Sequence, residues 1–405
     1  MGKRSGDGFV AHKAMLVNAL SRALAERVML MDFTIGRKGF VGYLKALNGS
    51  NVVKIAPFSV SASGERTNGH KRLKVICGAN TSYLADSEWI GEKTPLTLCD
   101  VRVSPNNAVT PNIGSLELAE ALNRVLPFTA KDDNRPVLSC VLFAAKDGKL
   151  TLVSADGFRL AVVTLDYDGE GQALISRDEL RGIANALRRA KRARIGFEGE
   201  DVTKPSSLIL DTELIRYKWT SHGGNYPEWQ KLIPTEFTTF AHFDAVEAIK
   251  ATLSLKVLSD NPKAYPIDLT IGDGKIVMAN PDSKGQAEVS ADTEGQGFVR
   301  IDGQYLTNAL KACGGMVDFK LAKSYSPTLF ATDGYQLVVM PMLTDRSKEE
   351  QKRDYEAKAK AESPAEPVSE PAEPEVTEVV AQAEAIAEAE TKPKRSRKRD
   401  RVAVA

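Results

Sequence analysis

The chain has 405 residues, which is too many for one compact hydrophobic core, so we expect two or three domains. Apolar residues make up 42% of it and charged residues 26%, as in an ordinary soluble protein, and a formal charge of +1 indicates no class of partner. The four cysteines form no CxxC pair, which argues against a zinc site and a disulfide framework. We therefore expect a reducing, cytoplasmic location, with no metal ion and no cofactor.

The N-terminal residues 1–31 predict a helical extension. Apolar residues recur from Ala14 onwards, but polar and charged residues interrupt them, which is the pattern of an amphipathic helix. No apolar run in the chain reaches the roughly 18 residues that cross a membrane, and none resembles the apolar part of a signal peptide. We place one helix at Met15–Met29 and expect no strands beside it.

Residues 32–112 predict a short or degenerate domain. An apolar helix face in this stretch matches the face of a helix 140 positions further along, and Ile55 matches Ile195. This copy lacks the strands that separate two helices in the later parts of the chain, so it is expected to be incomplete. The residues of its helix face are Phe40, Tyr43, Leu44 and Leu47.

Residues 113–236 predict a complete module of helix, strands, helix and strands. The first helix has Leu118, Leu122 and Val125 on one face, at the i, i+4, i+7 spacing. Three strand-like runs follow, and a Lys-Asp-Gly turn joins the first two. These runs are 136–145, 149–155 and 159–167.

The second helix of this module is predicted to begin at Ser176, where Glu179 completes a capping box. Its apolar face and the preceding turn recur 126 positions further along, which defines another module over residues 237–344. The turn Asp147-Gly148-Lys149-Leu150 becomes Asp273-Gly274-Lys275-Ile276. The face Leu180, Ile183, Ala184 and Leu187 becomes Leu306, Ala309, Leu310 and Cys313, and the first helix of this copy has Val246, Ile249 and Leu253.

The C-terminal residues 345–405 predict a disordered tail. They consist mainly of Glu, Ala, Pro and Lys, with almost no aromatic or large aliphatic residues, so they cannot bury enough apolar surface to become ordered. The tail is acidic first and basic last. Its basic end is Lys392, Lys394, Arg395, Arg397, Lys398, Arg399 and Arg401.

Basic residues are concentrated in the second helix of the middle module. Arg181, Arg188 and Arg192 fall near one side of it, a pattern that neutralises phosphates whatever the base sequence. A solvated helix surface explains the same charges, and for a single helix it is the commoner explanation. No zinc finger and no aromatic platform for single strands is visible in the sequence. The candidate DNA-binding residues are Arg124, Arg181, Arg188, Arg189, Lys191, Arg192 and Lys250.

Motifs for catalysis are absent from the sequence. The four histidines are scattered, and there is no HExxH, no GxSxG and no Walker loop. Asp156 beside Gly157 is a candidate metal carboxylate, but a turn-forming Asp-Gly is far more common. We therefore expect a protein that is not an enzyme.

Four ordered segments resemble the bacterial DNA polymerase III β subunit, the replicative sliding clamp. The segment 134–143 (NRPVLSCVLF) resembles the family's RPVLNGVLF, and 155–161 (ADGFRLA) resembles its TDGHRLA. The segment 226–234 (YPEWQKLIP) is similar to FPDYxRxIP, and 338–342 (VVMPM) is similar to the VMPMRL that ends the family's chain. Each segment alone is weakly specific, whereas the four in family order are specific.

The resemblance implies an α+β DNA-clamp fold of repeated helix and antiparallel-sheet modules. In the family, two three-domain subunits join head to tail into a ring, with sheets outside and helices lining a basic central hole. It therefore implies a homodimer, sequence-independent binding of double-stranded DNA, and the DNA polymerase and clamp-loader subunits as partners, with no membrane. The chain would be a non-catalytic processivity subunit.

The resemblance also implies a hydrophobic groove between the second and third domains that binds short peptides of these partners. Met side chains are flexible and polarizable, so a Met-Pro-Met edge can repack around different peptides. Ordinary core packing is the alternative explanation for these apolar residues. The matching positions are Leu138, Ala155, Gly157, Phe158, Arg159, Leu160, Pro227, Lys231, Leu232, Val338, Met340, Pro341, Met342 and Leu343.

The sequence departs from the family's pattern at several positions. Ala155 and Phe158 stand where the family commonly has Thr and His, and Leu343-Thr344 replaces a terminal Arg-Leu, so a more apolar groove with an altered peptide preference is expected. The first domain matches only half of the family's module, which bears on ring closure. The alternative class is a clamp-fold DNA-binding accessory or regulatory protein that forms no closed ring and contacts DNA mainly through its basic C-terminal end.

Overall fold

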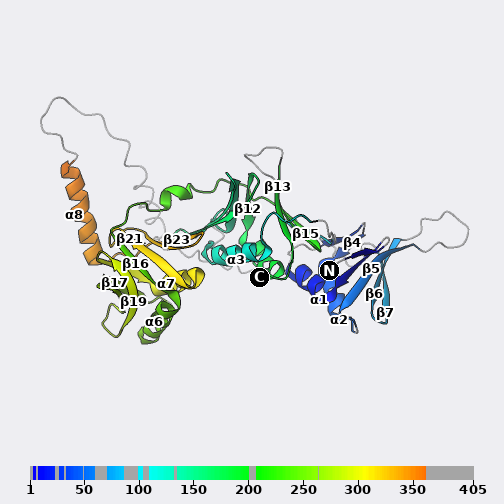
Figure 1. Cartoon of the computed structure of the whole chain (residues 1–405), viewed down its shortest axis with the longest axis horizontal. Helices are drawn as coiled ribbons and strands as arrows, with labels where there is room; N and C mark the ends of the chain where they lie inside the picture. Colours follow the sequence, from blue (N-terminus) through cyan, green and yellow to red (C-terminus); the bar gives the residue numbers. More distant parts are fainter. Residues whose placement is uncertain are drawn as a thin grey trace, which may run out of the picture. The chain divides into compact units, whose positions relative to one another are not determined.

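The structure is a computed structural model, shown in Figure 1, in which helices pack on mainly antiparallel sheets. Residues 1–351 form one compact unit and residues 352–405 a second. The fold is therefore α+β, as expected. The described residues are 3–5, 8–22, 27–31, 33–48, 50–59, 71–85, 99–103, 109–131, 135–199, 207–262 and 264–361.

The N-terminal part contains two sheets and two helices that pack against each other. Its elements are β1 (Lys3–Ser5), β2 (Gly8–His12), α1 (Lys13–Arg22), β3 (Arg27–Leu30), β4 (Phe33–Gly36), α2 (Arg37–Ala46), β5 (Val52–Ser59), β6 (Lys71–Cys77), β7 (Asn80–Ala85) and β8 (Cys99–Val103). One sheet has the strand order β1-β2-β5-β6-β7. Phe40 and Leu44 of α2 are fully buried, as the helix face predicted.

The prediction that residues 1–31 form a helical extension without strands is wrong. The helix α1 ends well before Met29, because β3 follows it and forms a hairpin with β4. Leu30 pairs with Phe33 in this hairpin, and Met31 adopts a φ of +56° between them. The pairing of β2 with β5 and of β3 with β4 also crosses the predicted boundary at residue 32. Sheet pairing thus overrides the local helical periodicity.

The second N-terminal sheet is completed by a strand from later in the chain. β8 pairs with β3 in parallel and with β15 (Ile215–Thr220) antiparallel. Val101 of β8 accordingly lies opposite Val28 on one side and opposite Tyr217 on the other. β8 therefore joins the N-terminal part to the middle module through one continuous sheet.

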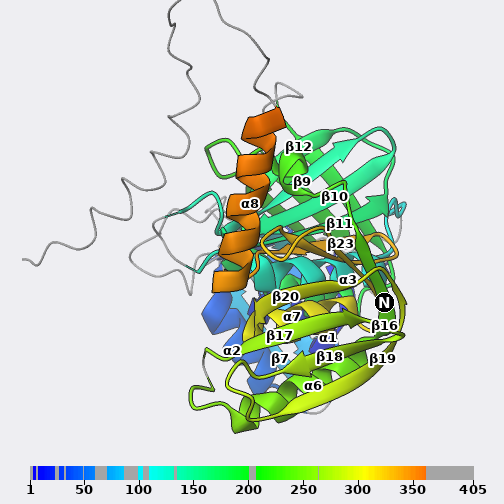
Figure 2. The same ribbon diagram turned by 90° about the vertical axis from the view of Figure 1, so that its left-hand side faces the viewer.

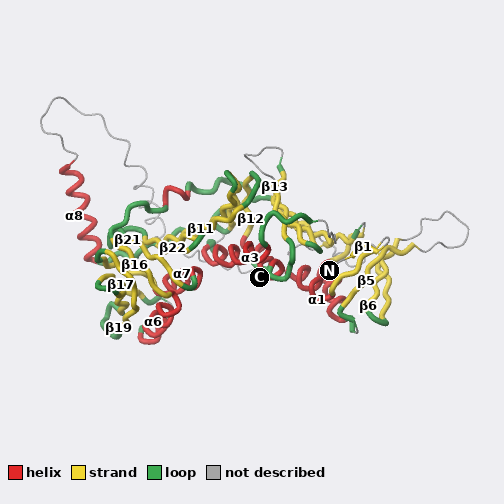
Figure 3. Tube along the Cα trace, viewed as in Figure 1, coloured by secondary structure: helices red, strands yellow, loops and turns green. Residues whose placement is uncertain are grey.

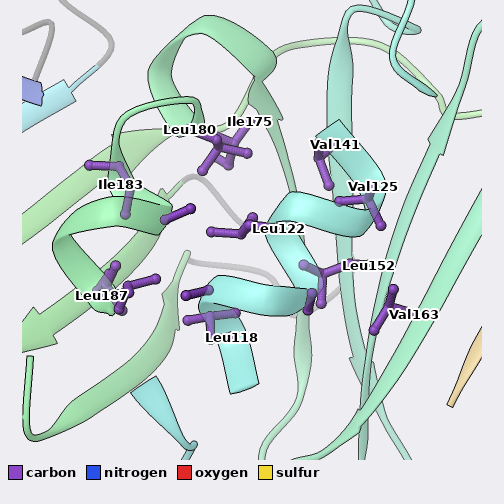
Figure 4. Close-up of a cluster of buried hydrophobic side chains, with 14 of the residues drawn as sticks. Leu118, Leu122, Val125, Val141, Leu152, Val163, Ile175, Leu180, Ile183 and Leu187 are labelled. Carbon is purple, nitrogen blue, oxygen red and sulfur yellow. The ribbon is translucent and has the colours of Figure 1, made fainter. Parts of the chain in front are cut away.

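The middle module follows the predicted order of helix, strands, helix and strands. Its elements are α3 (Ser115–Val125), η1 (Leu126–Phe128), β9 (Cys140–Lys146), β10 (Lys149–Ala155), β11 (Arg159–Asp166), β12 (Gly171–Ser176), α4 (Arg177–Leu180), α5 (Ile183–Leu187), β13 (Ala193–Glu198), β14 (Ser207–Thr212), β15 and η2 (Trp229–Leu232). The helix α3 buries Leu118, Leu122 and Val125, as predicted. Figure 4 shows these side chains meeting residues of the strands and of α4 and α5.

The second helix of this module is split, in contrast to the prediction of one continuous helix. Ser176 caps it as expected, with its hydroxyl accepting a hydrogen bond from the Asp178 amide. The helix then breaks at Gly182, the residue type that costs a helix interior most after proline. Arg188 and Arg192 lie beyond the end of α5, so they do not share a helical face with Arg181.

The first strand of this module also begins later than predicted. Residues 136–139 form a turn, in which the Leu138 amide donates to the Arg135 carbonyl and the Cys140 amide donates to the Val137 carbonyl. Pro136 has no amide hydrogen to give to a sheet, so β9 starts at Cys140. Asn134, at the start of the motif, lies outside the described residues.

The third module repeats the middle one. Its elements are β16 (Thr239–Asp244), α6 (Ala245–Leu258), β17 (Pro266–Gly272), β18 (Lys275–Ala279), β19 (Gln286–Glu294), β20 (Gly297–Asp302), α7 (Gly303–Cys313), β21 (Met316–Leu321), β22 (Thr328–Thr332) and β23 (Tyr335–Val339). The repeated turns have the same backbone, since φ is +53° and +75° at Asp147-Gly148 and +51° and +75° at Asp273-Gly274. The whole predicted face of α7, from Leu306 to Cys313, is buried. The internal repeat is therefore confirmed at these elements.

The predicted apolar face of α6 is not its buried face. Val246 and Leu253 are exposed by 51% and 41%, whereas Ala248 and Leu255 are buried. The helix carries apolar residues around most of its circumference, so periodicity did not fix which side faces the sheet. In Figure 2, the strands β17 to β20 are seen in front of α7.

A twelve-stranded sheet joins the middle and third modules. Its order is β12-β9-β10-β11-β23-β22-β21-β16-β19-β18-β17-β20, and the link between modules is the antiparallel pair β11–β23. One face of β11 buries Ala161 and Val163 in the core with α3, which Figure 3 shows on one side of these strands. The other face carries Leu160 and Val162 into a second apolar cluster.

The predicted tail begins with a helix. Residues 345–361 form α8 (Asp345–Ala361), so the prediction of disorder from residue 345 is wrong for this segment. Alternating charges in this stretch suit an exposed helix, and Thr344 and Ser347 supply its start with hydrogen bonds. Residues 362–405, with the prolines and the basic end of the tail, lie outside the described residues. In the described part of the chain, every helix is too short or too polar to span a membrane.

Candidate partner-binding and DNA-binding surfaces

The Ala155–Leu160 turn is held by the carboxylate of Asp156. One of its oxygens accepts hydrogen bonds from the amides of Phe158 (3.1 Å) and Arg159 (2.8 Å), and the other accepts two from the Arg159 guanidinium (2.9 and 2.6 Å). Gly157 between them has a φ of +92°, and a Cβ there would come within 2.7 Å of Arg135 Nη1. The Asp-Gly pair is therefore a structural turn, not a metal site.

The Arg159 side chain supports this turn from beneath. It is 7% exposed, and its guanidinium lies over the rings of Phe128 and Tyr305, 5.0 and 4.3 Å from their centroids. Because side chains alternate along a strand, Arg159 and Leu160 point to opposite faces of β11. Arg159 thus ties the middle module to α7 and does not contribute its charge to the surface around Leu160.

The Met-Pro-Met edge lies directly beside this turn. Leu160 pairs with Val338 across the β11–β23 ladder, and the Met340 amide donates to the Phe158 carbonyl at 2.9 Å. Leu160 and Val338 are buried, whereas Phe158 and Met340 are exposed by 59% and 43%. Buried apolar residues thus form a floor, and large exposed apolar side chains stand at its edge.

The segment around η2 adds another side to this surface. Tyr226 and Trp229 pack against the buried cluster that contains Leu160 and Val338. Burial raises the pKa of Tyr226 far above its ordinary value. Leu232 is 54% exposed, and Lys231 forms an exposed ion pair with Glu228. We call this the candidate partner-binding surface, made of Leu138, Ala155, Phe158, Leu160, Pro227, Leu232, Val338 and Met340.

The last three predicted residues of this site extend toward another strand. The Met342 amide donates to the Arg300 carbonyl of β20 at 2.7 Å. Arg300 is itself fixed by two hydrogen bonds to Asp268, which raise the pKa of the guanidinium. Met342 and Leu343 are exposed by 41% and 51%. Pro341, Met342 and Leu343 therefore lead from the candidate partner-binding surface to the start of α8.

The predicted basic residues fall into two groups. Two of them have structural contacts: Arg124 lies over the Tyr335 ring at 5.5 Å, and Arg189 donates to Asn18 of α1 when that amide is oriented to accept. The others are exposed and lie after the end of α4, after the end of α5, or on α6. They are Arg181, Arg188, Lys191, Arg192 and Lys250.

A basic hollow near α4 was not foreseen from the sequence. It has a volume of about 490 Å³ and is lined by Lys131, Arg177 and Arg181, with Asn123 and Thr129 among the polar residues beside them. Arg177 also donates to the Ala130 carbonyl. Lys131 and Arg177 are far apart in sequence and lie in no shared periodic pattern, so sequence spacing could not reveal that they meet.

The fold resembles that of solved β subunits of bacterial DNA polymerase III, the DNA sliding clamps. The structure aligns with that β subunit from Thermotoga maritima with a TM-score of 0.60 and 17% identity, covering 83% of this chain and 99% of that one. The solved sliding clamp of Pseudomonas aeruginosa aligns with a TM-score of 0.60 and 20% identity, covering 83% and 99%.

In sequence, the chain resembles curated proteins named beta sliding clamp. It is 23% identical to that of Streptomyces coelicolor over 255 residues, which are 55% of this chain and 64% of the relative. It is 25% identical to that of a Synechocystis species over 248 residues, covering 56% and 63%. The chain thus spans less than two thirds of the length of these relatives. No family model matches it.

Proposed function

We propose that this chain is a DNA sliding clamp, a non-catalytic processivity factor that encircles double-stranded DNA as a head-to-tail homodimer and tethers a replicative DNA polymerase. The observation that carries the proposal is the way the modules join. At each internal junction the last strand of one module pairs with a strand of the preceding part, through β23–β11 and β15–β8. If every junction forms in this way, one strand edge remains unpaired in the first module and one in the last.

The two open edges are visible in the described strands. β7 is the edge strand of the N-terminal sheet β1-β2-β5-β6-β7, and among the described strands it pairs with β6 alone. At the junction inside the chain, residues 159–163 of β11 pair with β23. The repeat of 126 residues places 285–289 at the corresponding position of the third module. In β19, Gln286–Ser290 pair with β18 alone among the described strands. We infer that β7 of one copy adds to this part of β19 in the other, because unpaired strand edges recruit strands.

The helices support the same junction. Between modules α3 contacts α7 and α1 contacts α5, which leaves α2 and α6 as the corresponding pair across the subunit boundary. The C-terminal half of α6 carries exposed apolar residues, with Val257 at 82% and Leu258 at 47% exposure. Leu258 lies beside Gly285, at the start of the open edge of β19. An exposed apolar patch next to an open strand edge is typical of a subunit interface.

Exposed cations would hold the DNA without reading its sequence. Arg181 and Lys131 in the basic hollow, with Lys250 on α6, can neutralise phosphates from the helix side of the sheets. Such contacts weaken with salt and permit sliding. Arg124 and Arg189 are assigned mainly to packing, because each already has a protein partner.

The candidate partner-binding surface is assigned to short peptides of the polymerase and of clamp-loader subunits. Its buried floor and exposed Phe158, Leu232 and Met340 provide an apolar anchor site. Phe158 makes it more apolar than a histidine would. Met340 can repack around different side chains, which suits several partners that share one surface.

A topological experiment tests the proposal. The full chain, loaded with a bacterial clamp loader and ATP onto nicked circular DNA, should elute with the DNA on gel filtration and be released when a restriction enzyme linearises the circle. A chain that stays on circular and linear DNA alike is a non-ring binding protein, which is the alternative class. A chain that elutes free from both also contradicts the clamp proposal.

A further inference from the structure

The face of the N-terminal sheet that points away from the core is basic and aromatic. Along β5 and β6, Val53, Ile55 and Val75 are fully buried. Because side chains alternate across a strand, the residues between them point to the opposite face of the sheet. On that face lie five residues that we call the basic aromatic face: Lys54, Phe58, Arg72, Lys74 and Tyr83.

The two rings of this face lie together with a lysine over both. The ring centroids of Phe58 and Tyr83 are 4.8 Å apart, with an angle of 49° between the ring planes. Lys74 Nζ lies 6.0 Å from the first centroid and 5.9 Å from the second. The strand register explains this grouping, since Lys74 is opposite Tyr83 and Phe58 is opposite Arg72. Tyr83 is 43% exposed.

The sheet carries positive charge that its own strands do not neutralise. The strands β1, β2, β5, β6 and β7 contain no Asp or Glu. Within the described residues, Lys54, Arg72 and Lys74 form no ion pair, whereas Lys218 and Arg216 on the neighbouring sheet share the carboxylate of Glu198.

We propose that the basic aromatic face binds single-stranded nucleic acid, a role that goes beyond the proposed clamping of duplex DNA. Exposed rings on a sheet offer stacking surfaces to unpaired bases, and neighbouring cations contact the phosphates between them. A duplex keeps its bases stacked internally and would use only the cations. An acidic peptide would likewise need the charges but not two adjacent rings. The proposed pairing of β7 with β19 of a second copy uses the edge of the strand, so it leaves the basic aromatic face uncovered.

The affinity of the full chain for a single strand tests this assignment. Fluorescence anisotropy with a labelled oligo-dT of about 15 nucleotides should show binding that weakens by roughly tenfold or more when Phe58→Leu and Tyr83→Leu are combined. Leucine retains the apolar contacts of each ring but cannot stack on a base. Tyr83→Phe retains the ring and should leave the affinity unchanged.

Controls separate this face from the rest of the protein. Lys74→Ala should weaken oligo-dT binding and lower its salt dependence, whereas Lys320→Ala, which removes a matched lysine over the Phe237 ring, should change neither. A duplex of the same length should bind the double-leucine variant as tightly as the original chain. Equal losses for duplex and single strand, no loss in the double-leucine variant, or displacement of oligo-dT by polyglutamate but not by unlabelled oligo-dT would each overturn the proposal.

The test is independent of the proposed clamp function. The double-leucine variant should still be retained on circular DNA and released by linearisation, because strand addition at the edge of β7 uses backbone groups, whereas the two rings lie on the face of the sheet. Loss of oligo-dT binding with intact topological retention supports the assignment. Loss of topological retention in this variant would instead place the rings in the clamp itself and contradict the separate role.

Discussion

At the scale of single residues, Arg159 shows how the partner-binding surface depends on a group that does not face it. Its guanidinium is held by Asp156 and lies between the rings of Phe128 and Tyr305. These contacts join the turn that carries Phe158 to α7 of the third module. The exposed Phe158 ring itself lies 6.3 Å from the Tyr305 ring, so its position depends on the same buried contacts.

We expect Arg159→Ala to lower the free energy of unfolding by about 3 kcal/mol, because it leaves a largely buried carboxylate without its charged partner. Urea denaturation followed by circular dichroism measures the change. Lys149→Ala removes the partner of Asp166 in an exposed pair and should leave the free energy of unfolding nearly unchanged. Equal effects of the two substitutions would show that burial does not strengthen the Arg159 pair.

Tyr335 is expected to make the free energy of unfolding depend on pH in the alkaline range. It is fully buried, and this burial raises its pKa well above the ordinary value of 10.0. The folded state therefore retains a proton that the unfolded state releases, so stability is full below pH 10 and falls as the pH rises toward the folded pKa. Tyr335→Phe should reduce this fall in unfolding experiments between pH 8 and 11, relative to the original chain. A fall of unchanged steepness in the variant would exclude Tyr335 as its source.

The sequence revealed individual residues only where a local pattern determined their role. Asp156 and Gly157 were recognised as a turn because the pair itself favours one. No local pattern marks Arg135, because its guanidinium comes near Gly157 only in the folded turn. Lys131 and Arg177 likewise share no spacing pattern, because they line a common hollow only in the folded chain.

At the scale of elements, α8 begins with reciprocal hydrogen bonds. The Ser347 amide donates to Thr344 Oγ1 at 3.1 Å, and the Thr344 amide donates to Ser347 Oγ at 2.6 Å. This is the geometry of a capping box with serine at its third helical position. Ser347 is buried, and Arg346 lies over the Phe298 ring at 5.1 Å, so the first turn is fixed to the third module.

Thr344→Ala should weaken the start of α8 by about 1 kcal/mol, because it removes the acceptor for an amide that has no partner within the helix. Hydrogen exchange at residues 345–351 should become faster, on the order of fivefold. Ser254→Ala on the exposed side of α6 removes a hydroxyl that is not a cap and should leave this exchange unchanged. Unchanged exchange after Thr344→Ala would contradict the capping role.

The elements with strong local signals were predictable, and those set by tertiary pairing were not. The helix faces of α3 and α7 and the repeated Asp-Gly turns follow from spacing and turn chemistry. The end of α1 and the strand β3 depend on pairing with β4 and β8, which no local periodicity contains. For α6, apolar residues on several sides left the buried face undetermined.

At the scale of the whole molecule, the proposed ring requires the exposed end of α6 to meet a second copy. Val257→Asp should raise the dissociation constant of the homodimer by about tenfold or more, because it places a charge where an apolar side chain would be buried. Light scattering across a concentration series measures this. Since Val257 is 82% exposed in the single chain, the substitution should not change the free energy of unfolding of the monomer.

Leu116→Asp provides the matched control, because Leu116 is a 56% exposed apolar residue on α3, away from the open strand edges. This substitution should leave the dimer intact. A dimer that withstands Val257→Asp, or one that dissociates equally with Leu116→Asp, would exclude the α6 end from the interface. A persistent monomer at all concentrations would remove the basis for an autonomous ring.

The strand β8 is synthesised long after β3, the strand with which it pairs in parallel. Val28 pairs with Val101, so the strand β3 emerges from the ribosome with one edge unsatisfied until about seventy further residues have followed. Even then, β8 gains its second neighbour only when β15 is made. We expect the N-terminal part to mature together with the middle module, and a fragment ending before Cys99 to remain open to proteolysis at β3.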